Sequence, residues 1–236
     1  MREAVILCGG KGTRLAPYTT VFPKPLMPLG ETPILEIVLR QLARDGFGHA
    51  TLAVGHLAAL IEAYFGDGSQ VGLPLSYSRE LEPLGTAGPL RSIPGLHEPF
   101  LVMNGDVLTT LDYGRFLDDH TKSGADLSVA TFRRTQAVDF GVVEIGGAGL
   151  VTGYIEKPSS EYVVSMGVNA VSPVVLERLT PGERLDFPDL VLRLIGAGRP
   201  VRGVPFDGYW LDIGRHDDFE AAQREFAARR SEFLGE

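Results

Sequence analysis

Short apolar runs recur along the chain, and each is bounded by Gly, Pro or Asp. They read "EAVILC" (3–8), "ATLAVG" (50–55), "FLVMNGD" (100–106) and "DLSVATF" (126–132). Longer segments of helical period lie between them, so strand and helix alternate in the first half. Strands that are apolar along their whole length are typical of a parallel sheet covered by helices on both faces. The pattern therefore predicts an α/β fold, Rossmann-like, with three layers and a mostly parallel sheet.

The segment 33–46, "PILEIVLRQLARDG", is the clearest helix of the first half. Its residues Ile34, Ile37, Val38 and Leu42 fall on one face. Pro33 suits a first helical turn and Gly46 a C-terminal cap, so we expect a helix within these bounds.

The second half changes character. Residues 126–175 are rich in short strands with glycine turns, which predicts a small β-rich lobe appended to the parallel core. A helix over 186–198, a strand-like stretch over 200–214 and a last helix over about 215–233 follow.

Composition and charge exclude several classes of protein. A net charge of −8 argues against nucleic-acid binding, which needs a basic face. No apolar run reaches the roughly 20 residues that cross a bilayer, and the N-terminal apolar run is too brief for a signal peptide. We therefore expect a cytoplasmic protein without a membrane partner. The single cysteine, Cys8, is expected in the core, and the five scattered histidines show no ligand spacing.

The stretch "ILCGGKGTRLAPYTTVFPKPLMPLG" (6–30) follows the first predicted strand. It fits neither G-x-G-x-x-G, because Leu15 stands where the third glycine belongs, nor a Walker A loop, because Gly12 follows Lys11. Glycines after a strand still let backbone N–H groups approach an anion, and Arg14 and Lys24 add positive charge. This chemistry suits a triphosphate.

The whole motif set resembles that of the sugar-1-phosphate nucleotidyltransferases, and particularly their mannose-1-phosphate guanylyltransferase-like members. The opening stretch carries the resemblance, together with later segments in the same order: "EPLGTAGPL" (82–90), "NGD" (104–106), "FGVVE" (140–144), "EKP" (156–158), "DFPDL" (186–190) and "GYWLDIG" (208–214). It implies one domain, 1–236, that is the catalytic domain without the β-helix of longer relatives. Its nucleotide-binding part would be about 1–110, its sugar-phosphate part about 111–215 and its C-terminal helix 215–233.

The resemblance also implies roles for individual residues. Asp106 and Asp212 would hold Mg²⁺, the implied cofactor, and two carboxylates brought together favour a cation between them. The catalytic residues would be Arg14, Lys24, Asp106 and Lys157. The nucleotide would bind to Leu7, Gly9, Gly10, Gly12, Thr13, Arg14, Lys24, Glu82, Gly85, Thr86 and Gly105. The sugar phosphate would bind to Gly141, Glu156, Lys157 and Gly167.

Base and sugar are less sharply defined. Segment 82–90 resembles family members that use GTP, with Gly85 allowing close backbone contact and Thr86 expected to cap the helix that follows. Ser165-Met166-Gly167 stands where the family commonly has Asn-Ala-Gly, so mannose 1-phosphate and a heptose 1-phosphate both stay open. The implied partners are the triphosphate and the sugar 1-phosphate, and a homo-oligomer is open because dimers and tetramers are common in the family.

Three alternatives compete with a guanylyltransferase. The first is a thymidylyl- or uridylyltransferase that acts on glucose 1-phosphate. The second is a non-catalytic nucleotide-binding subunit, which would have no need for the full set of charged motif residues. The third is a glycosyltransferase, which is disfavoured because Val107 and Leu108 follow "NGD" where a D-x-D motif would be required.

Overall fold

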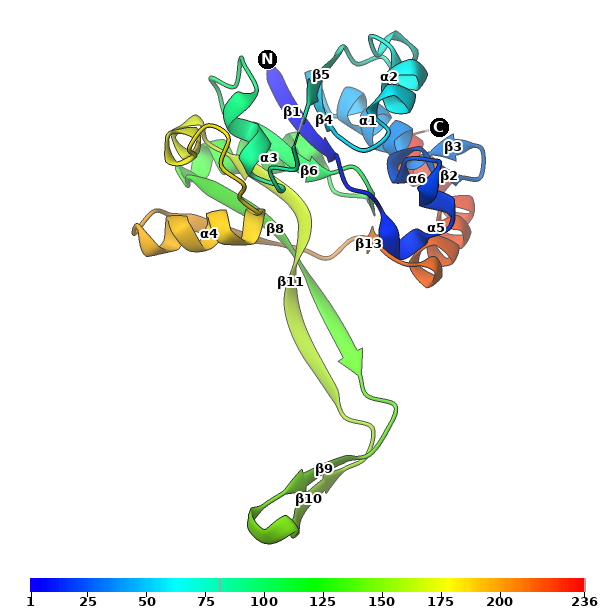
Figure 1. Cartoon of the computed structure of the whole chain (residues 1–236), viewed down its shortest axis with the longest axis vertical. Coiled ribbons are helices and arrows are strands. Elements are labelled where there is room, and N and C mark those ends of the chain that lie inside the picture. Colours follow the sequence, from blue (N-terminus) through cyan, green and yellow to red (C-terminus); the bar gives the residue numbers. More distant parts are fainter. Residues whose placement is uncertain (81, 236) are drawn as a thin grey trace.

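A seven-stranded sheet forms the centre of the molecule (Figure 1). The computed structural model describes residues 1–80 and 82–235. The strand order is β12-β8-β11-β6-β1-β4-β5. The strands are β1 (Arg2–Cys8), β4 (Phe47–Val54), β5 (Leu75–Arg79), β6 (Phe100–Asn104), β8 (Leu127–Ala137), β11 (Ser159–Val171) and β12 (Val201–Phe206). Of these seven, only β11 runs antiparallel to its neighbours, so the prediction of a mostly parallel sheet is confirmed.

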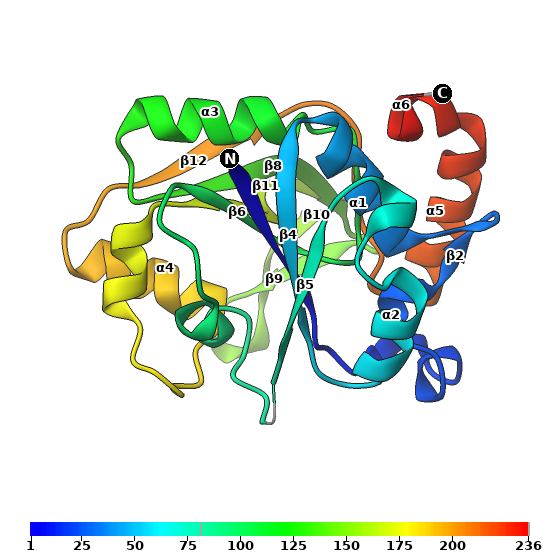
Figure 2. The same cartoon turned by 90° about the horizontal axis from the view of Figure 1, so that it is seen from above.

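Helices cover both faces of the sheet, which confirms the three layers. One face packs against α1 (Ile34–Arg44), α2 (Ala58–Phe65) and α3 (Tyr113–Ser123), and the other packs against α4 (Phe187–Gly196). Figure 2 shows α3 and α4 on opposite sides of β8, β11 and β6. Alternation along β1 explains the layering, because Ile6 and Cys8 join the first core while Val5 joins the second. The expected burial of Cys8 is confirmed.

Helix α1 agrees with its sequence pattern. Ile34, Ile37, Val38 and Leu42 are fully buried. Pro33 stands at the N-cap, and Gly46, with φ of 80°, follows the C-terminal end.

A third apolar cluster fixes the segments around the glycine stretch. It joins the C-terminal helices to residues next to the candidate site: Leu15, Met27, Leu29, Ile34, Ile37, Leu108, Ile213, Ala222, Phe226 and Phe233. The single helix predicted over 215–233 is two helices, α5 (His216–Ala228) and α6 (Arg230–Leu234), because Arg229 leaves the helical conformation with φ of −126°. Two small sheets complete this side: β2 (Pro28–Leu29) with β3 (Thr32–Pro33), and β7 (Val107–Thr109) with β13 (Trp210–Asp212).

The β-rich lobe is an extension of two strands of the central sheet. Strands β8 and β11 run on beyond the body as a two-stranded arm, and β9 (Val142–Ile145) and β10 (Val151–Ile155) form its tip (Figure 1). The pairing of β8 with β11 shifts register between Ser165 and Asn169. The arm begins at this irregularity. Among the described helices, none has the length and apolar character needed to cross a membrane.

Candidate active site

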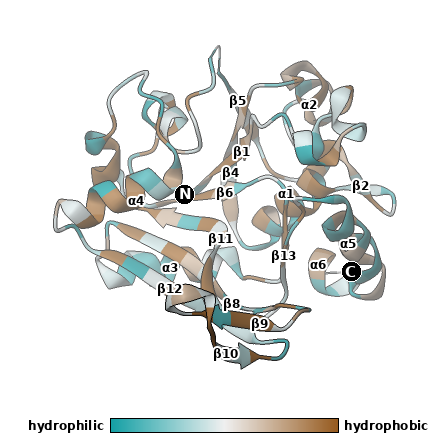
Figure 3. Ribbon diagram, turned by 60° about the horizontal axis from the view of Figure 1, so that its bottom comes forward, coloured by the Kyte–Doolittle hydropathy of each residue, from teal (hydrophilic) through white to brown (hydrophobic). Residues whose placement is uncertain are grey.

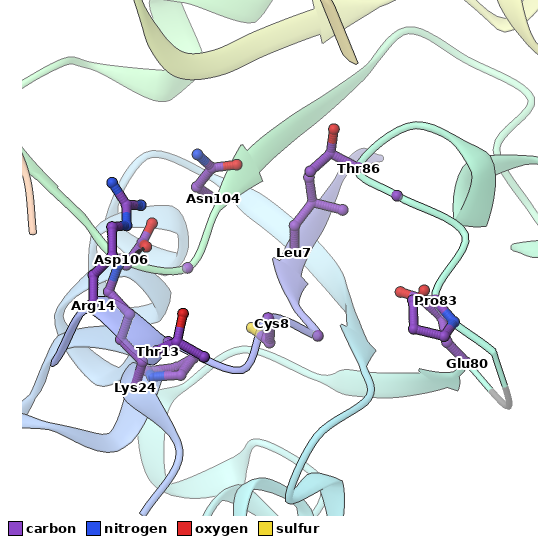
Figure 4. Close-up of a pocket in the computed structure, with 16 residues that line it drawn as sticks. Leu7, Cys8, Thr13, Arg14, Lys24, Glu80, Pro83, Thr86, Asn104 and Asp106 are labelled. Atoms are coloured by element: carbon purple, nitrogen blue, oxygen red, sulfur yellow. Dashed lines mark hydrogen bonds and ion pairs between the residues drawn. The ribbon is translucent and has the colours of Figure 1, made fainter. Parts of the chain in front are cut away.

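A cavity of about 400 Å³ opens at the carboxyl ends of β1 and β6 (Figure 4). This is the edge at which α/β sheets bind ligands. Eleven of the predicted site residues line it: Leu7, Gly9, Gly10, Gly12, Thr13, Arg14, Lys24, Gly85, Thr86, Gly105 and Asp106. Most of the sequence-predicted nucleotide site is therefore assembled in one place.

The glycine loop is held in a compact turn. Gly12 has φ of 61°, and a Cβ there would lie 3.0 Å from Thr19 Cγ2. The Thr19 hydroxyl donates a hydrogen bond of 2.7 Å to the Gly12 carbonyl. Nothing lies within 4 Å of a Cβ built on Gly10, so this part of the loop presents open backbone to the cavity. Such backbone can approach a phosphate closely.

Lys24 and Asp106 form a largely buried ion pair. The Lys24 ammonium donates to Oδ2 of Asp106, and its side chain is only 9% exposed. Oδ1 of Asp106 is buried and has no hydrogen-bond partner among the described residues. Figure 4 shows Lys24, Asp106 and Arg14 gathered at one end of the cavity. One oxygen of Asp106 is thus neutralised, and the other is left for a cation.

The fold brings Asp212 to Asp106, although the two are far apart in the chain. Asp212 pairs with Val107 in the β7–β13 sheet, and the Ile213 N–H donates to the Asp106 carbonyl at 3.1 Å. Burial raises the pKa of Asp212, and the negative charge of Asp106 raises it further, while Lys24 and Arg14 partly oppose the shift. The two predicted metal-binding carboxylates are therefore close enough to repel each other.

This donor set fits Mg²⁺. Magnesium commonly takes one or two carboxylates and completes its shell with water and substrate phosphate oxygens. The described residues contain no cluster of three or more His, Cys, Asp or Glu side chains that could enclose a metal without such ligands. Two observations support the prediction: Oδ1 of Asp106 has no hydrogen-bond partner among the described residues, and the charges of Asp106 and Asp212 repel each other.

The far wall of the cavity comes from segment 83–86. Gly85 has φ of 79°, and a Cβ there would lie 2.5 Å from the Leu185 carbonyl. The expectation that Thr86 caps the helix that follows it is wrong. Its hydroxyl instead accepts a hydrogen bond of 2.7 Å from the backbone N–H of Phe187. Thr86 therefore caps α4, a helix that lies about 100 residues further along the chain. Glu82 lies outside the lining, whereas Glu80, which was not predicted, lines the cavity.

Gly167 stands behind Asn104 at the edge of the cavity. It has φ of 71°, and a Cβ there would lie 2.7 Å from Asn104 Nδ2. Asn104 lines the cavity and was missing from the predicted site residues. Its signal was present in the sequence, because it is a polar residue at the end of an apolar strand directly before Gly105.

Three predicted sugar-phosphate residues, Gly141, Glu156 and Lys157, lie on the arm and do not line the cavity. The Tyr154 hydroxyl donates a hydrogen bond of 3.1 Å to the Glu156 carboxylate, and the Tyr154 side chain lies against Gly141. Lys157 is exposed, with φ of 44°. Their predicted role stays a prediction.

A second depression, here called the arm groove, lies between the arm and the body and has a volume of about 590 Å³. Arg14 belongs to both the cavity and this groove. The groove is lined by Arg14, Arg134, Thr135, Gln136, Ala137, Val164, Trp210, Asp212, Gly214, Arg215 and Asp218. It therefore joins the candidate site to the base of the arm.

Comparison with known families decides the class of this site. The sequence model of a family described as nucleotidyl transferase matches residues 3–229. This chain belongs to that nucleotidyl transferase family. Relatives named for sugar-1-phosphate substrates confirm the resemblance to the sugar-1-phosphate nucleotidyltransferases.

Relatives within the family are named for different nucleotides. A UTP–glucose-1-phosphate uridylyltransferase from Synechocystis sp. is 33% identical over 247 residues, covering 96% of this chain and 64% of the relative. A mannose-1-phosphate guanylyltransferase from Mycobacterium tuberculosis is 34% identical over 227 residues, which cover 92% of this chain and 62% of the relative. The chain thus spans less than two thirds of these relatives.

Solved structures of the family share the fold. The crystal structure of HddC from Yersinia pseudotuberculosis in complex with GMP-PN superposes with a TM-score of 0.74 at 25% identity. The match covers 96% of this chain and all of HddC. The fold class predicted from the sequence is therefore confirmed by a family member as well as by the chain's own topology.

Proposed function

We propose that this chain is a Mg²⁺-dependent guanylyltransferase that joins GTP and a sugar 1-phosphate into a GDP-sugar and releases pyrophosphate. The sugar is mannose 1-phosphate or a related one such as a heptose 1-phosphate. The observation that carries the proposal is the approach of Asp212 to Asp106 beside Lys24 and Arg14.

The proposed reaction needs alignment more than it needs a protein nucleophile. An anionic phosphate oxygen of the sugar 1-phosphate attacks the α-phosphorus of the triphosphate. The bond from that phosphorus to the bridging oxygen breaks, and pyrophosphate leaves with the electron pair. Two unit charges about 4 Å apart repel by roughly 4 kcal/mol at an effective dielectric of 20, so the site must offset this repulsion.

The charged residues of the cavity suit this task. Arg14 would hold the leaving pyrophosphate and bind it more strongly as negative charge develops there. Lys24 would hold the Asp106 side chain in place through their largely buried ion pair. Asp106 and Asp212 would hold Mg²⁺, which when bound neutralises phosphate charge. The open backbone at Gly10 would face the phosphates.

The choice of GTP is supported by segment 82–90 and by similar proteins. Gly85 and Thr86 of this segment line the cavity. The Mycobacterium tuberculosis relative is named a guanylyltransferase, and HddC has been crystallised with GMP-PN. The Synechocystis relative favours a second candidate, a uridylyltransferase that acts on glucose 1-phosphate. A cytoplasmic location stays a prediction.

A matrix of nucleoside triphosphates against sugar 1-phosphates, with pyrophosphate detection, tests the proposal. We expect the fastest release with GTP and mannose or heptose 1-phosphate in the presence of Mg²⁺. Asp106→Asn should lower turnover at least about 100-fold. Asp119→Asn, a half-exposed carboxylate on α3, is the matched control and should leave turnover unchanged.

Three results would contradict the proposal. Unimpaired turnover by Asp106→Asn would remove Asp106 from the mechanism. Fastest release with UTP and glucose 1-phosphate would favour the second candidate. GTP binding without pyrophosphate release from any sugar 1-phosphate would indicate a non-catalytic binding subunit.

A further inference from the structure

The arm exposes an unusual amount of apolar surface. Eleven large apolar side chains between residues 138 and 163 are exposed: Val138, Phe140, Val142, Val143, Ile145, Leu150, Val151, Tyr154, Ile155, Tyr162 and Val163. Phe140 is 77% exposed, and Ile145 and Leu150 are each 69% exposed. Figure 3 shows β9 and β10 coloured as predominantly hydrophobic.

This surface is large enough for a stable interface. These side chains are 37 to 77% exposed, so at roughly 150 Å² for a fully exposed side chain of this size the arm presents on the order of 900 Å² of apolar area, summed over both of its faces. Monomeric proteins rarely expose contiguous apolar patches larger than a few hundred Å². A standard protein–protein interface buries about 800 Å² on each partner. The arm therefore has the surface of an element that is covered by protein.

The arm also holds Glu156 and Lys157 away from the cavity of its own chain. These residues follow β10 and precede β11, at the junction between the arm and its tip. From Ser165 to Ser159, β11 pairs with β8 without a break, which is about 20 Å of extended chain at 3.3 Å per residue. In Figure 1 this stretch leads away from the body. The candidate site consequently lacks its predicted sugar-phosphate lysine.

We propose that two copies of this chain exchange arms, so that the arm of each copy enters the arm groove of the other and brings Lys157 to its Arg14 and Asp212. The sequence itself identifies the occupant as a second copy, because the residues that the site lacks are carried on the arm. The proposal rests on the proposed function for the role of Lys157. The exchange of arms is a separate claim about assembly.

The charges of the groove suit this occupant. Asp212 and Asp218 line it and can face the Lys157 ammonium, while Arg134 and Arg215 can face Glu156. Arg14 and Lys157 would then face one sugar phosphate with their positive charges. The exchange of arms would also bury the exposed apolar side chains of both arms between the two copies.

A heterodimer of two inactive variants tests the exchange. Lys157→Ala and Asp106→Asn chains are co-expressed with different affinity tags, and the heterodimer is isolated by tandem purification. If arms are exchanged, one site of each heterodimer combines an intact Asp106 with an intact Lys157, so about half of the wild-type activity returns. If each arm serves its own chain, both sites are defective and the heterodimer is inactive.

The assembly itself provides a readout that does not depend on activity. Wild-type protein should sediment at twice the chain mass of 25.5 kDa. Ile145→Lys places a charge on the exposed tip and should give a folded monomer. Leu192→Lys is the matched control, because Leu192 is 66% exposed on α4, outside the arm, and this variant should stay dimeric.

The outcomes separate the two claims. An inactive heterodimer, failure to obtain any heterodimer, or a wild-type monomer would overturn the exchange of arms. Absence of pyrophosphate release by wild-type protein that is a dimer, and that Ile145→Lys converts to a monomer, would overturn the proposed function and leave the interface standing.

Discussion

The cavity and the arm carry different parts of one motif set, and the fold treats them in different ways. Around the cavity, Leu15 and Ile213 are at most 1% exposed and hold the neighbouring Arg14 and Asp212 against the body. On the arm, Phe140 is 77% exposed and Val163 is 68% exposed. Packing within one chain therefore fixes the cavity residues, whereas the arm residues depend on what the arm contacts. The predictions below test this difference.

The largest difference is expected between two lysines. Lys24→Ala leaves the partly buried Asp106 carboxylate without its charged hydrogen-bond partner, so it should lower the free energy of unfolding by about 2 kcal/mol as well as turnover at least about 100-fold. Lys157→Ala should lower turnover by a similar factor but change the unfolding free energy of the chain by less than about 0.5 kcal/mol, because the side chain is exposed within its own chain. Denaturant unfolding and pyrophosphate release measure the two effects. An equal loss of unfolding free energy in both variants would contradict the claim that packing within one chain fixes Lys24 but not Lys157.

An intermediate effect is expected at the wall of the cavity. Thr86→Val removes the hydroxyl that accepts from the Phe187 N–H, and should cost about 1 kcal/mol of stability. Because Thr86 lines the cavity, KM for the triphosphate should rise more than kcat falls. Thr121→Val, which removes a hydroxyl bonded within α3, is the control for losing a threonine hydroxyl and should leave KM unchanged. A KM that is unaffected in Thr86→Val would remove this segment from nucleotide binding.

The smallest effect is a pH dependence of stability at Asp212. Burial and Asp106 raise the pKa of this carboxyl, so the folded chain binds its proton more tightly than the unfolded chain does. The contribution of Asp212 to the free energy of unfolding is therefore fully present at a pH below its pKa in the unfolded chain. It is lost as the pH rises through its higher pKa in the folded chain. Without divalent cations, Asp212→Asn should melt at a higher temperature than wild type at pH 7, and this difference should shrink towards pH 4. Thermal melts in EDTA measure it, and a difference that does not change with pH would contradict the assigned repulsion.

Much of the body could be predicted because its pattern is local. Short, nearly continuous apolar runs identified the strands, and the spacing of Ile34, Ile37, Val38 and Leu42 identified α1. The glycine stretch lies at a strand end, and parallel strands bring such ends to one edge. Sequence order alone could therefore place Gly9, Arg14 and Asp106 together.

The parts that sequence could not predict depend on contacts between distant segments. Thr86 caps α4 because Gly85 lets segment 185–187 approach closely, and no pattern near Thr86 indicates this. The extent of the arm was missed for a similar reason. Continuous strands β8 and β11 leave the body at a register shift near Gly167, and the glycine turns of this region also fit a compact lobe.

The central claim is that Asp106 and Asp212 together hold the divalent cation of the transfer reaction. A crystal grown with Mn²⁺, a non-hydrolysable GTP analogue and mannose 1-phosphate tests it through the anomalous signal of manganese. The account predicts a peak within about 2.3 Å of a carboxylate oxygen of each aspartate. A peak elsewhere, or none between these two side chains while both substrates are bound, would contradict it.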